Sequence, residues 1–164
     1  MKRSGDTQGA PGEVAERAID FDELPTYVGY QVRRTQARLF SELESALKAF
    51  ALTPGSFGVL TLIHANPGVT QGALAVAFGV DKSTMSPVIV RLEQRGLVRR
   101  EVLASDRRRQ ALFLATAAEP TYRAARDRMR AVEADIAARL TKTEQRELGR
   151  LLAKLQSKGG PDEA

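Results

Sequence analysis

The stretch "VTQGALAVAFGVDKSTMSPVIVRLEQRGLV" (residues 69–98) contains the signals for two helices joined by a short turn. Thr70 is a suitable N-cap for the first helix, and Gly79 can adopt the left-handed conformation that ends it. Asp81 is a suitable N-cap for the second helix, and Gly96 ends that one. Two helices joined by a turn of about three residues that contains glycine form a helix-turn-helix unit. The alternative is an ordinary pair of packed helices.

The apolar residues of this stretch agree with the helix-turn-helix assignment. Large apolar side chains fall where the two helices must contact each other, at Leu74, Phe78, Val80, Met85 and Val88. Ala75 is small where the helices cross. Val88, Leu92 and Leu97 are interpreted as core residues. Pro87 lies inside the second helix and removes one hydrogen bond, so we expect that helix to continue with a kink or a loosened first turn.

A basic hairpin follows the two helices. The segments "LVRREVLA" (residues 97–104) and "QALFLAT" (residues 110–116) are predicted strands joined by "SDRRR" (residues 105–109). A hairpin in this position is a wing, and arginines at its tip are suited to phosphates or to the negative minor groove. We expect Asp106 to pair with a neighbouring arginine and to hold the turn in shape. The alternative is a hairpin tip that serves only solubility.

The charge of the chain is concentrated in the same region. Residues 82–109 contain eight basic and three acidic side chains, an excess of five that equals the net charge of +5 for the whole chain. A basic stripe in an otherwise balanced chain favours a polyanionic partner over a merely solvated face.

Long amphipathic helices are predicted on both sides of the winged unit. Apolar residues recur at helical spacing in residues 24–50 and 120–140, and "TKTE" (residues 141–144) is a capping box that starts a last helix. The apolar faces of these helices need a partner, so we expect them to pack on each other and on a second subunit.

The predicted fold is mainly α-helical with a small β-hairpin wing, a winged helix-turn-helix with N- and C-terminal dimerisation helices. The predicted domains are a disordered tail at 1–20, a dimerisation region at 21–50 and 117–157, a winged DNA-binding domain at 51–116, and a disordered tail at 158–164.

Composition argues against several classes of protein. The chain has no cysteine, which excludes disulfides, thiolate zinc sites and thiol redox sensing. It has no apolar run of about 20 residues and no secretory signal in "MKRSGDTQGAPGEVAE", so a cytoplasmic protein is expected. No phosphate loop, paired carboxylates, nucleophile elbow or metal cluster is present, so we expect neither an enzyme nor a cofactor or metal.

The order of elements and two motifs resemble the MarR family of bacterial transcriptional regulators. The motifs are "TQGALAVAFGVDKSTMSPVIVRLEQRGLVRR" (residues 70–100) and "SDRRRQALFLA" (residues 105–115). Ala115 replaces a threonine that is frequent in the family at the exit of the wing. The front portion, "LPTYVGYQVRRTQARLF…LTPGSFGVL", is similar to members that sense phenolic acids or their coenzyme A thioesters.

The resemblance implies roles for particular residues. The helix at 81–95 would enter the major groove of DNA. Base-facing residues would be Ser83, Thr84, Ser86 and Pro87. Residues nearer to phosphate would be Lys82 and Arg91, with Thr70 and Gln71 anchoring a phosphate through backbone N–H groups. The adjacent minor groove would receive Arg107, Arg108 and Arg109.

A ligand site is predicted from aromatic and basic residues near each other on two helices. The first helix contributes Tyr27, Tyr30, Arg33 and Arg34, and the second contributes Phe57, Thr61 and His64. Aromatic rings beside guanidinium groups are suited to a flat anion such as an aromatic carboxylate or its coenzyme A thioester. The alternative is that these residues pack the dimer and that His64, the single histidine, is structural.

The sequence therefore predicts a ligand-responsive transcriptional regulator. The resemblance implies a repressor, because repression is the usual mode of the family. It would bind a pseudo-palindromic double-stranded operator as a homodimer and be released by a small aromatic acid or its thioester. The alternative function is a winged-helix module that uses its basic face on acidic protein partners or membranes, without specific DNA binding.

Overall fold

The computed structural model describes residues 19–103 and 106–157, with backbone only for residues 103 and 106–109. The predicted tails lie outside the described residues, apart from Ile19 and Asp20. The chain forms two compact units, one ending at Gln36 and the other beginning at Ala37.

The first unit contains the start of the long helix α1. A short 3-10 helix, η1 (Leu24–Thr26), precedes α1 (Val28–Leu47). Gln31 in α1 donates a side-chain hydrogen bond to the Pro25 carbonyl at 2.5 Å. The Phe21 ring lies 6.4 Å from that of Tyr30. These contacts fold the preceding segment against the first turns of α1.

The second unit begins with the end of α1 and a three-helix group. A 3-10 turn, η2 (Lys48–Phe50), leads to α2 (Pro54–Ala65), which Thr53 caps in a capping box with Ser56. The next helix, α3 (Gln71–Phe78), is capped by Thr70 and ended by Gly79 at a φ of 64°. It is followed by α4 (Lys82–Gln94), capped by Asp81. These boundaries confirm the predicted helices.

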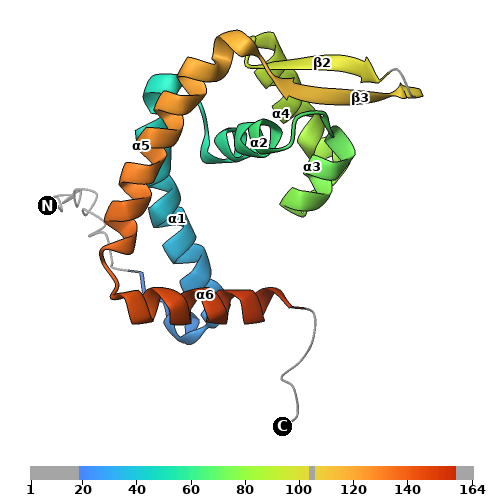
Figure 1. Ribbon diagram of the computed structural model, residues 1–164. Helices are drawn as coiled ribbons and strands as arrows, with labels where there is room; N and C mark the ends of the chain where they lie inside the picture. Colours follow the sequence, from blue (N-terminus) through green and yellow to red (C-terminus); the bar gives the residue numbers. More distant parts are fainter. Residues whose placement is uncertain (1–18, 104–105, 158–164) are drawn as a thin grey trace, which may run out of the picture. The chain divides into compact units, whose positions relative to one another are not determined.

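The helices α3 and α4 meet at 117°, within the usual range for a helix-turn-helix. Figure 1 shows them beside α2 and the hairpin of the wing. Pro87 is the sixth residue of α4, and the helix is assigned without interruption through it.

The wing is a three-stranded antiparallel sheet in the order β1-β3-β2. Its strands are β1 (Val69–Thr70), β2 (Val98–Leu103) and β3 (Asp106–Leu114). The sequence prediction of a connecting turn at residues 105–109 was wrong, because the backbone from Asp106 onward already belongs to β3. Its register is irregular there, since Val102 faces Gln110 whereas Leu103 faces Asp106. The two-residue strand β1 is too short to leave a periodic signal in the sequence.

Two long helices follow the wing. The turn η3 (Thr116–Ala118) leads from β3 into α5 (Glu119–Ala137), and α6 (Lys142–Gln156) follows (Figure 1). Ala115 is the N-cap of η3 without a side-chain hydrogen bond. The predicted capping box at the start of α6 is confirmed, between Thr141 and Glu144.

One apolar core joins the helices to the sheet. Its fully buried side chains include Leu47, Leu60, Ile63, Leu74, Ile89, Leu92 and Leu112. Burial of such a side chain stabilises a fold by about 1.5–3 kcal/mol. The core prediction is confirmed for Leu74, Met85, Leu92 and Leu97, and Val88 packs partly buried against the cluster.

Two of the side chains that were predicted to be internal are not buried. Phe78 and Val80 remain 36% and 37% exposed. Phe78 is the last residue of α3 and its ring lies beside Gly58 of α2, where an added Cβ would be 3.0 Å away. Val80 lies in the turn itself. Ile89 of α4, which was not among the predicted core residues, is fully buried in the core.

No single helix in the described part of the chain is long and apolar enough to cross a membrane, and only two bent helix pairs reach that length and composition together.

Candidate nucleic-acid interface

The start of α3 provides backbone N–H groups, and the first residue of α4, Lys82, places its positive charge beside them. The Thr70 hydroxyl accepts a hydrogen bond from the Ala73 amide at 3.3 Å. The earlier amides of the helix, on Gln71 and Gly72, have no intrahelical acceptor. The Lys82 side chain lies over Gly72, where an added Cβ would be 3.3 Å from Cε and 3.8 Å from Nζ. The backbone amides at the start of α3 and the Lys82 ammonium group are together suited to bind one phosphate.

The resemblance implies a role for the backbone N–H of Gln71, and the side chain of Gln71 has a separate, structural role. Its Nε2 donates to the Lys82 backbone carbonyl at 3.2 Å and so fastens the start of α3 to the start of α4. Gly72 was not among the predicted site residues. Its signal was available, because it is a glycine in the first turn of a helix, where a small residue permits close approach.

The N-terminus of α4 is fixed by one carboxylate. Asp81 Oδ1 accepts hydrogen bonds from the Ser83 hydroxyl and the Thr84 amide, both at 2.6 Å. These hydrogen bonds, that of Ser83 foremost, lower the pKa of Asp81 to about 2. Because the Ser83 hydroxyl donates to Asp81, its oxygen is left as an acceptor toward a base edge.

The outer face of α4 carries mostly small and polar side chains. Ser83, Thr84, Pro87 and Arg91 are exposed, and Ser86 is half-buried. Val90 lies on the same face because it follows Ser86 and Pro87 by four and three residues, and it is 40% exposed. Val90 was not among the predicted site residues, although the helical spacing indicates it. A face of this kind offers hydroxyls for hydrogen bonds and a methyl-bearing contact for thymine.

The wing is joined to the end of α4 by a charged network. Arg100 of β2 donates from Nε and Nη2 to Glu93 of α4 at 2.8 and 2.7 Å, and from Nη1 to Gln110 of β3 at 2.5 Å. These hydrogen bonds lower the pKa of Glu93 and raise that of Arg100. The guanidinium thereby links three elements of the site.

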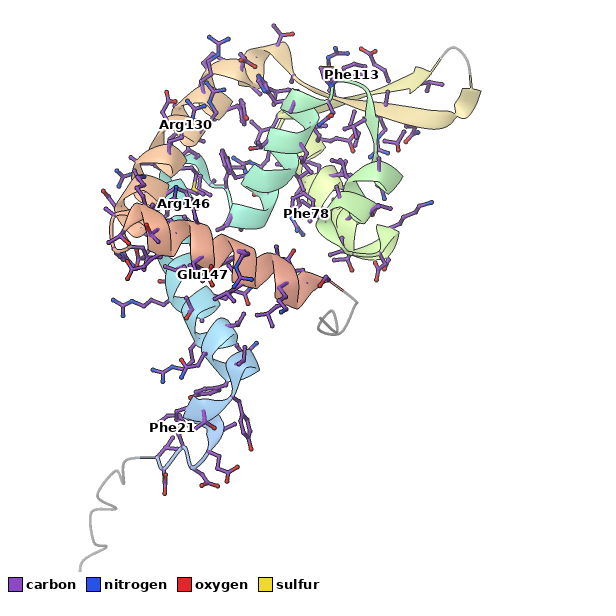
Figure 2. The ribbon with its side chains drawn as sticks, turned by 60° about the horizontal axis from the view of Figure 1, so that its bottom comes forward. Phe21, Phe78, Phe113, Arg130, Arg146 and Glu147 are labelled. Atoms are coloured by element: carbon purple, nitrogen blue, oxygen red, sulfur yellow. The ribbon has the colours of Figure 1, made fainter. Side chains whose placement is uncertain are left out.

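On the neighbouring position of β2, Arg99 pairs with Glu101 and lies 4.4 Å from the ring centroid of Phe113, which Figure 2 labels beside the hairpin. The side chains of Asp106, Arg107, Arg108 and Arg109 lie outside the described residues. Their backbone places them in β3.

In the first unit, the predicted ligand residues form one aromatic–cation contact. The Arg34 guanidinium carbon lies 5.7 Å from the Tyr30 ring centroid. The Tyr27 hydroxyl donates to Glu23 at 2.9 Å, and Arg33 is exposed.

In the second unit, α5 supplies residues that the sequence analysis missed. The buried ring of Tyr122 lies 6.1 Å from Phe57 and 4.6 Å from His64. His64 Nε2 lies 3.6 Å from Glu119, and the Thr61 hydroxyl donates to the Phe57 carbonyl. Tyr122 was indistinguishable from an ordinary core aromatic in the sequence.

Arg126 also lies near that ring, with its guanidinium carbon 5.7 Å from the Tyr122 centroid. Its Nε is buried without a hydrogen-bond partner in the described part of the chain. A group of three or more acidic, histidine or cysteine side chains that would hold a metal does not occur among residues 19–102 and 110–157.

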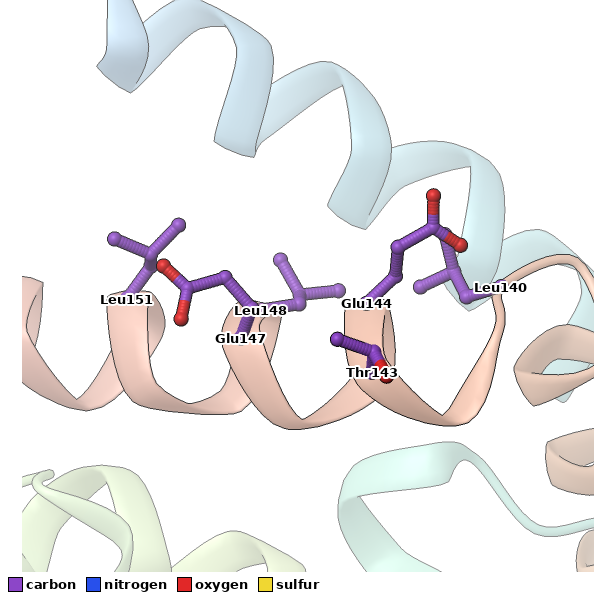
Figure 3. Close-up of a pocket in the computed structure, with 6 residues that line it drawn as sticks. All are labelled: Leu140, Thr143, Glu144, Glu147, Leu148 and Leu151. Carbon is purple, nitrogen blue, oxygen red and sulfur yellow. The ribbon is translucent and has the colours of Figure 1, made fainter.

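Two surface hollows lie elsewhere in the second unit. One, of about 610 Å³, is lined by residues from Ser41 to Thr53 at the junction of α1 and α2. The other, of about 380 Å³, lies along α6, where Leu148 and Leu151 project into it beside Glu144 and Glu147 (Figure 3). The apolar stripe of α6 stays exposed, with Leu148, Leu151, Leu152 and Leu155 at 38–61%.

Comparison with known proteins shows that the chain is similar to transcriptional regulators. The sequence pattern of the MarR family matches residues 52–109. The transcriptional repressor Rv2887 of Mycobacterium tuberculosis is 33% identical over 136 residues, which cover 83% of this chain and 96% of that protein.

Solved structures agree. The repressor CouR bound to a 23-mer DNA duplex has a TM-score of 0.79 at 29% identity, covering 86% of this chain and all of that one. The complex of Rv2887 with p-aminosalicylic acid has a TM-score of 0.61 at 32% identity, covering 80% of this chain and 99% of that one.

Proposed function

The chain belongs to the MarR family of transcriptional regulators, and from this premise we propose that it is a ligand-responsive repressor that binds a pseudo-palindromic operator as a homodimer. Residues 51–116 are the DNA-binding domain, and residues 21–50 and 117–157 form the dimerisation region. The protein acts in the cytoplasm, where bacterial operators lie, and it performs no catalysis.

The observation that carries the proposal is the surface around α4. An exposed hydroxyl-rich helix face, a cationic helix N-terminus at α3 and a wing fastened to α4 by Arg100 are combined on one three-helix unit. In this arrangement α4 is the recognition helix, reading bases through Ser83, Thr84, Ser86 and Pro87.

Phosphate contacts come from the surrounding residues. Lys82 and the N–H groups after Thr70, at Gln71 and Gly72, bind one phosphate, and Arg91 binds another. The arginines at positions 107–109 of β3 reach the minor groove beside the site. The CouR structure with a DNA duplex supports this assignment by similarity of fold.

Dimerisation follows from the unpartnered helices. In the described part of the chain, the leucines of α6 and the apolar residues before and in α1 are exposed. A second copy covers them, and a two-fold protein reads two half-sites about 10 bp apart.

The effector is a small aromatic carboxylate or its coenzyme A thioester. In the first unit, the Arg34 guanidinium carbon lies 5.7 Å from the Tyr30 ring centroid, and an aromatic ring beside a guanidinium group is suited to such an anion. The complexes of Rv2887 with p-aminosalicylic acid and with salicylic acid support this class of ligand. Binding would favour the dimer conformation whose recognition helices are wrongly spaced for DNA.

The test is DNA binding by the purified full chain. Fluorescence anisotropy should show nanomolar-range binding to a duplex selected from a randomised pool, at least about 10³-fold tighter than to random duplex. Light scattering at micromolar concentration should give a dimer. Affinity that is salt-dependent but equal for all duplexes would instead support the protein-interaction module, and a monomer would contradict the operator model of two half-sites.

A further inference from the structure

The C-terminal end of the recognition helix is fastened to the junction between α1 and α2. Arg95, the C-cap of α4, donates from Nη1 to the Ala51 carbonyl at 2.5 Å and from Nη2 to the Phe50 carbonyl at 2.7 Å. These two hydrogen bonds join residues 44 and 45 positions apart. They connect the recognition helix α4 with the segment that follows α1, at the end of the proposed dimerisation region 21–50.

The junction itself adopts a backbone conformation that needs support. Ala51 has φ 50° and ψ 38°, the left-handed region that glycine prefers and alanine rarely adopts. The last carbonyls of a helical segment lack intrahelical donors and carry negative partial charge. The Arg95 guanidinium supplies both donors and a positive charge there, so it stabilises the bend where α1 turns into α2 by 68°.

Both ends of this link are rigidly attached. Ile89 and Leu92, within two turns before Arg95, are buried in the core. Leu47, just before the junction, is also buried. A change in the direction of α1 at the junction is therefore transmitted to the last turn of α4 and not absorbed by loose side chains.

We propose that Arg95 is a positioning residue for DNA recognition. Its bidentate clasp on Phe50 and Ala51 sets the orientation of α4 relative to α1, and therefore the spacing of the two recognition helices in the dimer, without touching DNA. This inference rests on the proposed function as an operator-binding dimer.

A positioning role for Arg95 and an ordinary phosphate contact would affect DNA binding differently. A phosphate contact adds affinity for any duplex and contributes about one unit to the salt slope. A clasp adds affinity only where two half-sites must be engaged at one fixed spacing, because it acts on the distance between the recognition helices. Spacing preference and salt dependence therefore separate the two roles.

The experiment uses the duplex selected by the wild-type protein from a randomised pool. Binding is measured to that duplex, to versions with one base pair added to or removed from the centre, and to a single half-site. The proteins are wild type, Arg95→Ala, Arg95→Lys and the control Arg130→Ala, which removes an exposed arginine of α5 that pairs only loosely with Asp127 at 3.9 Å.

We expect Arg95→Ala to bind the selected duplex at least about fivefold more weakly. It should lose most of the preference for the selected spacing, while half-site affinity and salt slope stay as in wild type. Arg95→Lys keeps the charge but lacks the planar guanidinium group. Its affinity for the selected duplex and its spacing preference should lie between those of Arg95→Ala and wild type. Arg130→Ala should behave as wild type.

Equal weakening on every duplex, with a salt slope lower by about one unit, would overturn the proposal in favour of a phosphate contact. An unchanged spacing preference in folded Arg95→Ala would also overturn it. If Arg95→Ala does not fold by circular dichroism, the spacing preference of Arg95→Lys decides between the two roles. Failure of the wild-type protein to select any duplex would refute the proposed function itself, which is a different outcome.

Discussion

The Glu93 carboxylate at the end of α4 is held by the Arg100 guanidinium of β2 through two hydrogen bonds of 2.7 and 2.8 Å. Glu93 and Arg100 are each about a quarter exposed. The pair fixes the wing to the recognition helix, and Arg95 fixes the C-terminal end of the same helix to the junction between α1 and α2.

Glu93→Gln should loosen the wing. We expect the free energy of unfolding to fall by about 1 kcal/mol, since a charge-assisted pair of partly exposed groups is weakened, and operator affinity to fall several-fold. Urea unfolding and anisotropy measure the two effects. Glu147→Gln is the control, because Glu147 pairs with Arg150 within α6. Unchanged affinity in Glu93→Gln would show that the wing is positioned by other contacts.

Asp81→Ala should remove the N-cap of α4 and lower both stability and operator affinity, whereas Asp81→Asn should retain the cap. The pKa of Asp81 is about 2 in the folded chain against an ordinary value of 3.8. Because the folded pKa is the lower one, the charged carboxylate stabilises the fold fully above about pH 4 and loses this effect as pH falls toward 2.

The measurement for Asp81 is the urea midpoint of wild type and Asp81→Ala between pH 7 and pH 2. The gap between them should narrow as the carboxylate of the wild type becomes protonated. A gap that stays constant down to pH 2 would contradict the assigned role.

Gly72→Ala should lower operator affinity without lowering the stability of the fold. The added Cβ would lie 3.3 Å from Lys82 Cε, so the flexible lysine moves away from the N-terminus of α3. Stability should hold or rise by up to about 1 kcal/mol, because alanine favours helix over glycine. Operator affinity should fall, with a salt slope smaller by up to about one unit.

Gly55→Ala is the matched control for Gly72→Ala, since Gly55 is also the second residue of its helix and its added Cβ has no neighbour nearer than 4.0 Å. If both variants bind DNA alike, Lys82 does not act at the position described.

Replacement of the wing arginines, Arg107→Ala, Arg108→Ala or Arg109→Ala, should weaken operator binding, with at least one variant losing about 1–3 kcal/mol. Each arginine bound to phosphate should reduce the salt slope by about one unit. Arg128→Ala on α5 provides a control of equal charge change. A triple alanine variant with wild-type affinity at physiological salt would refute the wing assignment.

A panel of hydroxycinnamates, benzoates and their coenzyme A esters should contain an effector. Calorimetry should detect binding below millimolar concentration, and the same compound should lower operator affinity 5- to 150-fold through a coupling of about 1–3 kcal/mol. Arg33→Ala and Arg34→Ala should weaken its binding, whereas Arg38→Ala, on the same helix, should not. Absence of any binder, or equal affinity in all variants, would contradict the ligand site.

The sequence by itself determined the helix boundaries around the recognition helix. Thr70, Gly79 and Asp81 act through neighbouring backbone atoms, so their capping roles are local and readable from the chain. The buried positions of α4 follow from helical spacing in the same way, and the basic composition of the wing indicated a polyanion partner.

Only the tertiary structure decided which side chains from distant segments meet. Arg95 with Ala51, Lys82 over Gly72 and Tyr122 beside His64 are contacts between separate elements, and no periodicity predicts them. The sequence prediction for the wing failed at Asp106 for the same reason, because strand pairing across a hairpin depends on the register of the partner strand. Local signals specify where an element begins and ends, whereas packing and register specify what it contacts.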